Sequence, residues 1–256
     1  MFFKDTVFIG IDPSSGEESL TYAVLDKDLN LLAMSRQELS TVSAFAGGQK
    51  AAVIGVNAPR RTNQGLMKKD SVRDTLRPQP HPGRWTGFRV AEYILFQHNI
   101  RIPKTPEKVS DCPGWMRVGF KLYRRLEEMG FADYPGGDQP QKVLEVYPHG
   151  AYTVLLKRIP FLKKTLEGRL QRQLVLHSLA VDVPDPMRVF EEITRYKVLQ
   201  GQLPLEELYE VEELEALMAA YLAWKATVEP HEVTLVGDPR EGEIVLPAIE
   251  IKPTYH

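Results

Sequence analysis

The chain has 256 residues, of which 43% are hydrophobic and 26% charged, and its formal net charge is −2. This is the composition of a globular protein with a sizeable core, and the near-neutral charge gives no whole-molecule reason to bind nucleic acid or membranes. A single cysteine, Cys112, excludes an intrachain disulfide and a cysteine-rich zinc site. No apolar run reaches the ~20 residues of a membrane helix and we find no secretory pattern, so we expect a cytoplasmic protein.

The first predicted strand ends in a carboxylate. Residues 7–11 are mostly apolar, Asp12 follows them, and the turn residues 13–16 come next. A carboxylate at the end of a buried strand needs a cation, a hydrogen-bond donor or water. Asp12 is therefore either a cap that accepts backbone N–H bonds in the turn, or a metal ligand at the rim of a sheet.

Three more strands follow in the first quarter of the chain. The segments 19–26 and 29–39 are separated by a very short link, which indicates an antiparallel meander with the first strand. Residues 41–50 form at most a brief helix or loop. The apolar strand 51–60 follows this crossover, so we expect it to run parallel to the first strand, with Asn57 near its end.

Residues 60–89 form a loop-rich, basic insertion. Eight Lys and Arg residues stand against two Asp residues there, a net charge of +6 in a nearly neutral protein. Such a segment predicts a local surface for phosphates, to which arginines contribute bidentate hydrogen bonds. The arginines that we expect to contact a substrate are Arg60, Arg84 and Arg89.

The second half of the chain alternates between helices and strands. Helical periodicity covers 87–98 and 114–129, and a fifth strand at 141–149 carries Glu145. Residues 150–200 predict two or three helices. One more strand is expected at 243–251, after a turn at GDPREG.

The clearest helix lies at 205–226. Its small residues recur at helical spacing and form a stripe that allows close packing on a sheet: Ala216, Ala219, Ala220 and Ala223. Glu212 continues the stripe upstream, and Glu215 lies three residues further on, so that both can face one direction.

This order of elements predicts an RNase H-like sheet, in which acids from the first strand and a late helix meet at one rim. The four acids are Asp12, Glu145, Glu212 and Glu215. Phosphodiester hydrolysis uses such clusters, because oxygen ligands hold the divalent ions that stabilise the attacking and leaving oxygens. The alternatives are that Glu212 and Glu215 belong to a solvated first turn, and that Glu145 pairs with Arg89.

The chain also resembles a family of predicted RNase H-like nucleases, the domain-of-unknown-function family four-twenty-nine. The motifs that carry the resemblance are GID at 10–12, VNAPR at 56–60, RVAE at 89–92, EVYPH at 145–149, EGRLQRQ at 167–173, LEALMAA at 214–220 and GDPREGEIVLP at 237–247. The resemblance implies that the family's acids fall on Asp12, Glu92 and Glu145. The pair Glu212–Glu215 falls where RuvC-type resolvases, similar in fold, carry two aspartates.

Two positions depart from the family's pattern. The family usually has Asp where this chain has Asn57, and Asp is more usual at Glu215. An asparagine offers a cation an oxygen without a charge. A glutamate reaches one methylene further, which moves a ligand by more than the ~0.5 Å tolerance of a working site unless the helix compensates.

Two further candidates have structural alternatives. Arg89 and Glu92 are three residues apart, either in the site or in a salt bridge within their helix. His149 follows the fifth strand and is either a proton-transfer group or a cap of the next helix.

We therefore predict one α/β domain over residues 1–256, with a five-stranded RNase H-like mixed sheet and insertions at about 60–140 and 150–200. The predicted activity is nucleic-acid cleavage that depends on Mg²⁺ or Mn²⁺, with Asp12, Glu145, Glu212 and Glu215 as metal ligands. One alternative is an actin-like or sugar-kinase-like nucleotide-binding enzyme, because GIDPSSG resembles a first phosphate-binding turn. The other is a non-catalytic nucleic-acid-binding module whose site is weakened by Asn57.

Overall fold

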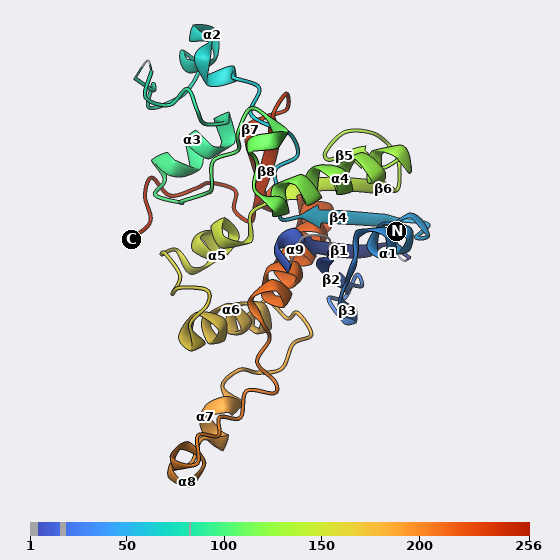
Figure 1. Ribbon diagram of the computed structural model, residues 1–256, viewed down its shortest axis with the longest axis vertical. Coiled ribbons are helices and arrows are strands. Elements are labelled where there is room, and N and C mark those ends of the chain that lie inside the picture. Colours follow the sequence, from blue (N-terminus) through green and yellow to red (C-terminus); the bar gives the residue numbers. More distant parts are fainter. Residues whose placement is uncertain (1–4, 16–18, 82) are drawn as a thin grey trace.

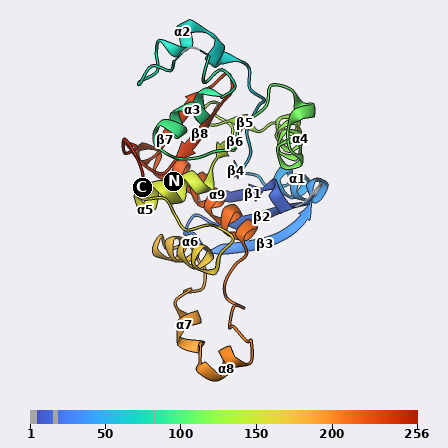
Figure 2. The same ribbon diagram turned by 60° about the vertical axis from the view of Figure 1, so that its left-hand side comes forward.

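The computed structural model describes residues 5–15, 19–81 and 83–256; the predicted turn residue Gly16 lies outside these ranges. Within them, a mixed sheet runs through the molecule with helices on both of its faces (Figures 1 and 2). Its strands are β1 (Val7–Asp12), β2 (Ser19–Leu25), β3 (Leu31–Glu38), β4 (Ala52–Val56), β5 (Ala132–Asp133), β6 (Gln141–Val146), β7 (Thr234–Asp238) and β8 (Gly242–Leu246).

The sheet order is β3-β2-β1-β4-β6-β8-β7, and β5 pairs with β6. Strands β1, β2 and β3 form the predicted antiparallel meander, and β4 runs parallel to β1 as predicted. The number of strands was wrong: the described residues form eight, not five. Two strands were not predicted: β5, which is two residues long, and β7, which pairs with β8 as a hairpin at the sheet edge. Strand β8 corresponds to the additional strand expected at 243–251. The α/β class with a mixed sheet is confirmed.

The helices lie mainly between β3 and β7 in the sequence. They are α1 (Leu39–Gly47), α2 (Asp70–Arg73), α3 (Val90–Gln97), α4 (Gly114–Glu128), α5 (Pro148–Leu156), α6 (Leu166–Ser178), α7 (Arg188–Glu192), α8 (Arg195–Leu199) and α9 (Val211–Val228). Short 3-10 turns occur at Pro13–Ser15, Leu66–Lys68, Val109–Asp111 and Pro230–Glu232. In the part of the chain that the structure describes, no helix is both long and apolar enough to span a membrane.

Helix α9 lies directly on the backbone of the sheet. Gly10 of β1 and Gly55 of β4 are paired neighbours beneath it. A Cβ atom on Gly10 would lie 1.9 Å from the carbonyl oxygen of Ala216, and one on Gly55 would lie 2.3 Å from that of Ala219. The glycines and the predicted alanine stripe therefore fit together, and no side chain separates the helix from the two central strands.

The opposite face of the sheet packs against α1 and α4. Ile9, Ile11, Ile54 and Val56 alternate with the residues that face α9, and they pack with Val118 and Leu122 of α4. The period-two alternation of a strand thus places two separate apolar layers on β1 and β4. It also decides to which face each polar side chain at the strand ends belongs.

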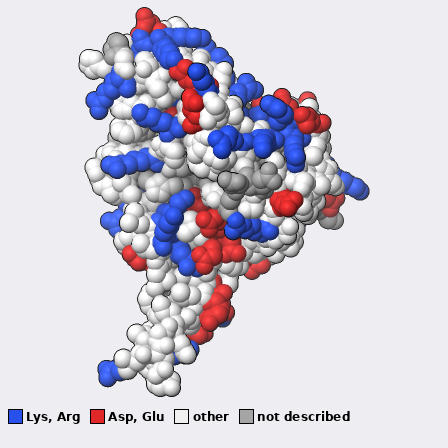
Figure 3. All heavy atoms as spheres, in the orientation of Figure 1, with Lys and Arg blue, Asp and Glu red and all other residues white. Residues whose placement is uncertain are grey.

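Two parts extend away from the sheet. The basic insertion around α2 lies at one end, where Lys and Arg side chains are interspersed with acidic ones (Figures 1 and 3). At the other end, α7 and α8 form an arm that leaves the body and returns to it (Figures 1 and 2). The buried amide nitrogen of Gln173 closes the base of this arm, because it donates to the carbonyl oxygens of Pro184 at 3.0 Å and Glu207 at 2.7 Å.

Candidate functional site

The ends of β1, β4 and β6 meet at one edge of the sheet. Ile11, Val56 and Glu145 lie in one row across the three strands, and Asp12 and Asn57 are the next residues of their chains. Neighbouring residues of a strand point to opposite faces. Asp12 therefore shares the α9 face with Gly10, whereas Glu145 shares the α4 face with Ile11 and Val56.

On the α9 face, two carboxylates meet around one amide. The Nδ2 atom of Asn57 lies 3.0 Å from Oδ1 of Asp12 and 3.4 Å from Oε2 of Glu215. Asp12 is 1% exposed and Glu215 is 2% exposed. The hydroxyl group of Ser14 donates to Oδ2 of Asp12. Close packing of α9 on β1 thus brings an acid from each element to the same point.

Burial and the neighbouring acid change the protonation of Asp12. Its pKa is raised from 3.8 to about 7, first because burial disfavours the charged carboxylate and second because Glu215 is negatively charged. Hydrogen bonds from Ser14 and Asn57 and the charge of Lys163 act in the opposite direction, more weakly. A cation placed between Asp12 and Glu215 would favour the ionised form of both.

Two basic side chains approach Glu215 from the segment before α6 and from α6 itself. Lys163 Nζ lies 3.6 Å from Oε2 of Glu215, and Nε of Arg172 lies 3.9 Å from Oε1. Arg172 is fully buried and its guanidinium lies over the ring of Tyr152, 5.4 Å from the centroid. Among the described residues, neither Nε of Arg172 nor Oε1 of Glu215 has a hydrogen-bond partner. The acid pair thus retains a buried oxygen with free bonding capacity.

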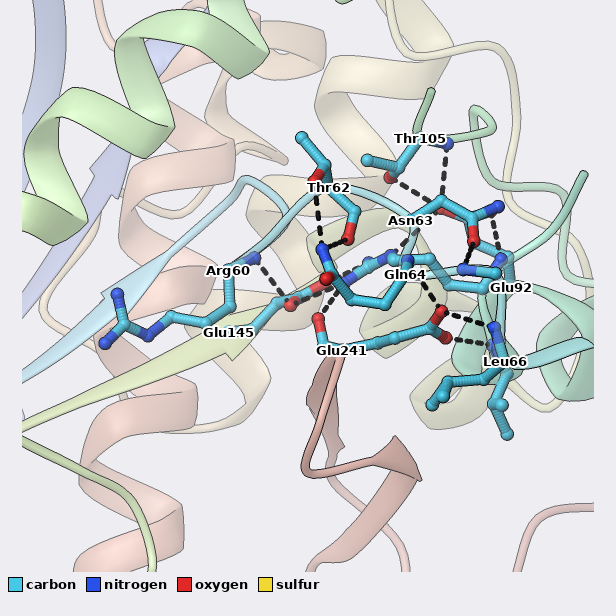
Figure 4. A network of polar contacts seen from close by, with 12 residues as sticks. Arg60, Thr62, Asn63, Gln64, Leu66, Glu92, Thr105, Glu145 and Glu241 are labelled. Atoms are coloured by element: carbon cyan, nitrogen blue, oxygen red, sulfur yellow. Dashed lines mark hydrogen bonds and ion pairs between the residues drawn. The ribbon is translucent and has the colours of Figure 1, made fainter. Parts of the chain in front are cut away.

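Glu145 is engaged in a separate network on the other face of the sheet (Figure 4). Its Oε1 accepts a hydrogen bond from NH2 of Arg89 at 2.5 Å, and its Oε2 accepts from NH1 of Arg89 at 3.0 Å and from the backbone N–H of Arg60 at 2.8 Å. The pairing of Glu145 with Arg89, one of the two alternatives from the sequence, is what the structure shows. The strand register explains this pairing. Glu145 lies in the row of Ile11, one residue before the row of Asp12, so its side chain points to the opposite face of the sheet.

The same network occupies Arg89, Glu92 and a further acid, Glu241. Nε of Arg89 lies 3.1 Å from Oε1 of Glu92, which also accepts from both the N–H and the hydroxyl group of Thr105. Glu241 accepts backbone N–H bonds from Gln64, Leu66 and Val90. All three side chains are 0–1% exposed. The network therefore fastens the basic insertion and the start of α3 to the sheet.

The remaining predicted residues lie in different places. Glu212 is half-buried, one turn of α9 before Glu215, and does not line the cavity described below. Arg60 extends toward Asp133 and Glu127, and Arg84 is exposed beside Trp85; neither lines the cavity. Of the four predicted metal ligands, Asp12, Glu145 and Glu215 line the same cavity. Only Asp12 and Glu215 meet around Asn57, whereas the carboxylate of Glu145 is bonded to Arg89 and to the backbone of Arg60. Within the described residues, no three His, Cys, Asp or Glu side chains are placed to hold one metal ion.

His149 is the second residue of α5 and lines the cavity. Its Nδ1 atom lies 3.5 Å from NH2 of Arg172. Burial, followed by the charges of Arg172 and Lys163, lowers the pKa of His149 to about 4. The imidazole is thus neutral at neutral pH and a weak base there, so it can take part in hydrogen bonds but does not bind an anion as a cation would.

A cavity of about 800 Å³ opens above the acid pair. Asp12, Asn57, Glu145 and Glu215 line it together with cations and with an apolar wall. The lining cations are Arg89, Arg101, Lys163 and Arg172, and the wall includes Ile102, Pro103, Trp115, Met116, Ile159, Phe161 and Leu162. Its volume is within the roughly 300–1,000 Å³ of sites that enclose a small ligand.

The acid pair fits a single Mg²⁺ or Mn²⁺ ion better than a pair of ions. Magnesium commonly uses one or two carboxylates and completes its octahedron with water and substrate oxygens. Asp12 and Glu215 supply two carboxylates, and Oε1 of Glu215 has no hydrogen-bond partner among the described residues, with Nε of Arg172 3.9 Å away. Asn57 offers an oxygen only if its amide turns over, since Nδ2 now faces both carboxylates.

Comparison with known proteins gives one match. The model of a family described as protein of unknown function, DUF429, matches residues 10–241. The chain belongs to the DUF429 family. Neither the curated proteins nor the solved structures gave a match. Five of the motifs that carry the DUF429 resemblance contribute residues to the cavity: GID, VNAPR, EVYPH, EGRLQRQ and LEALMAA. RVAE and GDPREG supply the network around Arg89, which also lines the cavity.

Sequence reasoning missed Lys163 and Arg172. Arg172 lies inside the EGRLQRQ motif, but its complete burial, which marks it as part of the site, is visible only in the structure. Lys163 lies in the connection between α5 and α6 and has no motif of its own. Glu241 was visible only as part of the GDPREG turn.

Proposed function

We propose that this DUF429 protein is a metal-dependent phosphodiesterase that cleaves nucleic acid, with an RNase H-like sheet as its scaffold. One observation carries the proposal: Asp12 and Glu215 are both nearly fully buried and meet around Asn57 at the floor of a cavity. Two adjacent buried carboxylates are unfavourable unless a proton or a cation lies between them. The antiparallel meander followed by parallel strands agrees with the RNase H-like interpretation.

The roles follow from the geometry. Asp12 and Glu215 would hold one Mg²⁺ or Mn²⁺ ion, which when bound supplies Lewis-acid stabilisation of phosphate oxygens and a more acidic water. Lys163, 42% exposed, is placed to contact a phosphate oxygen. Arg172 lies beside Glu215 as an ion-pair partner and holds the segment before α6 through the carbonyl oxygen of Phe161. Neutral His149 is placed to form a hydrogen bond within the cavity.

A pair of variants on one helix tests the proposal. Glu215→Gln removes a carboxylate of the cavity, and Glu212→Gln removes one that lies outside it, one turn away. We expect wild type and Glu212→Gln to be stabilised against heat by Mn²⁺ or Mg²⁺ and to cleave DNA or RNA. Glu215→Gln should lose the metal-dependent stabilisation and at least tenfold in cleavage rate, about 1.4 kcal/mol.

The substrates for this test are single-stranded, duplex and branched DNA and RNA. Equal activity of Glu215→Gln and wild type would disprove the proposed role of the acid pair. If wild type binds metal but cleaves none of the substrates, Asn57→Asp is the deciding variant, because it adds the charge that the family usually has. An inactive Asn57→Asp would exclude the phosphodiesterase and favour the non-catalytic binding module.

A further inference from the structure

We propose that the cavity takes an unpaired nucleotide of a single nucleic-acid strand rather than a phosphate on the outside of a paired duplex. The inference rests on the proposed function and specifies its substrate class. It is drawn from the depth of the acid pair, the apolar wall beside it and the cations that share the cavity.

The depth of the acid pair restricts what can reach it. Asp12 and Glu215 are 1% and 2% exposed at the floor of the cavity of about 800 Å³. In a duplex, each phosphodiester lies on the outside of a stiff cylinder with its base paired inward. Proteins that act inside a pocket therefore use single strands or extrude the target nucleotide from the helix.

The apolar wall has no role in holding a metal or a phosphate. Phe161 is 57% exposed and Leu162 is 78% exposed, and both line the cavity together with Trp115 and Ile102. Exposed aromatic side chains give unpaired bases a stacking surface, and stacking tolerates any base because every base has a π-face. A base that enters the cavity with its sugar and phosphate would cover this apolar surface.

Helix α6 holds the wall in position. The backbone N–H of Phe161 donates to Oε1 of Gln171 at 2.8 Å, and its carbonyl oxygen accepts from NH1 of Arg172 at 2.9 Å. Both backbone groups of Phe161 are thus fixed although its ring is exposed. A rigid aromatic surface loses little conformational entropy when a ligand binds.

Cations complete the pattern. Lys163 follows Leu162 directly and lies 3.6 Å from Glu215, and Arg101 lines the same cavity. Aromatic stacking surfaces combined with a cationic groove are the common means by which proteins bind single strands without sequence preference. The floor, the wall and the cations thus match the phosphate, the base and the strand backbone of one ligand.

Binding of a fluorescein-labelled oligothymidylate, followed by anisotropy in magnesium buffer, tests the inference. A gel of the same samples shows whether the strand stays intact, so binding is read independently of cleavage. The matched variants are Phe161→Ala, in the cavity wall, and Phe190→Ala, on α7, whose exposure of 55% is nearly the same. We expect Phe161→Ala to weaken binding about tenfold and Phe190→Ala to leave it unchanged. The same strand in a duplex should bind at least tenfold more weakly to wild type.

A second readout uses tryptophan fluorescence. The single strand should quench the emission of wild type, Trp115→Phe should lose this quenching, and Trp224→Phe should keep it, because the indole of Trp224 bonds the backbone of Lys27 instead. Equal binding of duplex and single strand, or no effect of Phe161→Ala, would overturn the inference even if the protein cleaves DNA. If free thymidine monophosphate binds as tightly as the strand, the ligand is a mononucleotide, and the inference that the cavity takes a strand is overturned. Selective binding of the single strand without cleavage would support this inference and contradict the proposed phosphodiesterase activity.

Discussion

Asp12 shows how a single carboxylate couples the site to the stability of the fold. In the unfolded chain it has an ordinary carboxyl pKa, whereas burial and Glu215 raise the pKa to about 7 in the folded protein. The folded state thus binds this proton more tightly than the unfolded state does. The resulting stabilisation is fully present below about pH 4 and is lost as the pH rises through about 7.

Asp12→Asn should remove this pH dependence. Wild type should lose a few kcal/mol of unfolding free energy between about pH 4 and about pH 8, since each pKa unit corresponds to ~1.4 kcal/mol. The variant should not show this loss, so its unfolding free energy minus that of wild type should increase with pH. Urea unfolding in the presence of a chelator measures the difference. Glu212→Gln is the control and should follow the wild-type profile. Parallel profiles for wild type and Asp12→Asn would show that Asp12 is ionised at no cost in the folded protein.

At the scale of elements, the contact between α9 and the sheet positions the acid pair. Gly10 and Gly55 leave no room for a methyl group beneath Ala216 and Ala219. Protein interiors are packed too closely to absorb such an overlap without moving the helix. Any movement of α9 away from β1 also moves Glu215 away from Asp12.

Gly10→Ala should therefore destabilise the protein by about 3 kcal/mol or more, because the new Cβ would overlap backbone atoms that cannot rotate away. Gly87→Ala is the control, since nothing lies within 4 Å of a Cβ at that position. Its effect should stay within about 0.5 kcal/mol. The urea midpoint of unfolding measures both. A Gly10→Ala midpoint equal to that of wild type would mean that α9 can shift on the sheet freely.

These elements also show where sequence reasoning succeeds. The alanine stripe of α9 and the apolar run of β1 were recognisable because periodicity and small residues leave a direct trace in the sequence. That trace also brought Asp12 and Glu215 forward together. The side of the sheet to which the Glu145 side chain points depends on the register between strands. Long-range pairing sets this register, and the local sequence pattern does not. Arg172 and Lys163 reach the site only through the packing of α6, so their part was not predictable.

At the scale of the whole molecule, the arm that contains α7 and α8 is attached through a narrow base. Many of its apolar side chains are exposed, among them Phe190, Tyr196 and Leu199. Buried Gln173 binds both of its ends and also accepts a hydrogen bond from the backbone of Tyr209 at 2.8 Å. Side chains of α6 thus order the base of the arm, because Arg169 also donates to the carbonyl oxygens of Leu208 and Tyr209.

Replacing residues 186–205 by a short Gly-Ser linker should leave the rest of the fold intact. The two carbonyl groups bound by Gln173 lie within 3.0 Å of one nitrogen, so the linker has little distance to span. We expect the free energy of unfolding to change by no more than about 1 kcal/mol. Gln173→Ala in the full chain should cost more, about 2–3 kcal/mol, because it leaves buried backbone groups unpaired. A collapse of stability in the linker variant would show that the arm supports the core.

The close packing of α9 on Gly10 and Gly55 also bears on which ions the site would accept. Because α9 lies directly on Gly10 and Gly55, the spacing between the backbones that carry Asp12 and Glu215 is set by contacts that no side-chain rotation can relieve. Calcium needs six to eight oxygens at 2.3–2.6 Å and flexible surroundings, whereas magnesium needs about 2.0–2.1 Å in a near-ideal octahedron. If Asp12 and Glu215 hold a cation as proposed, a backbone frame that cannot spread apart would favour the smaller ion.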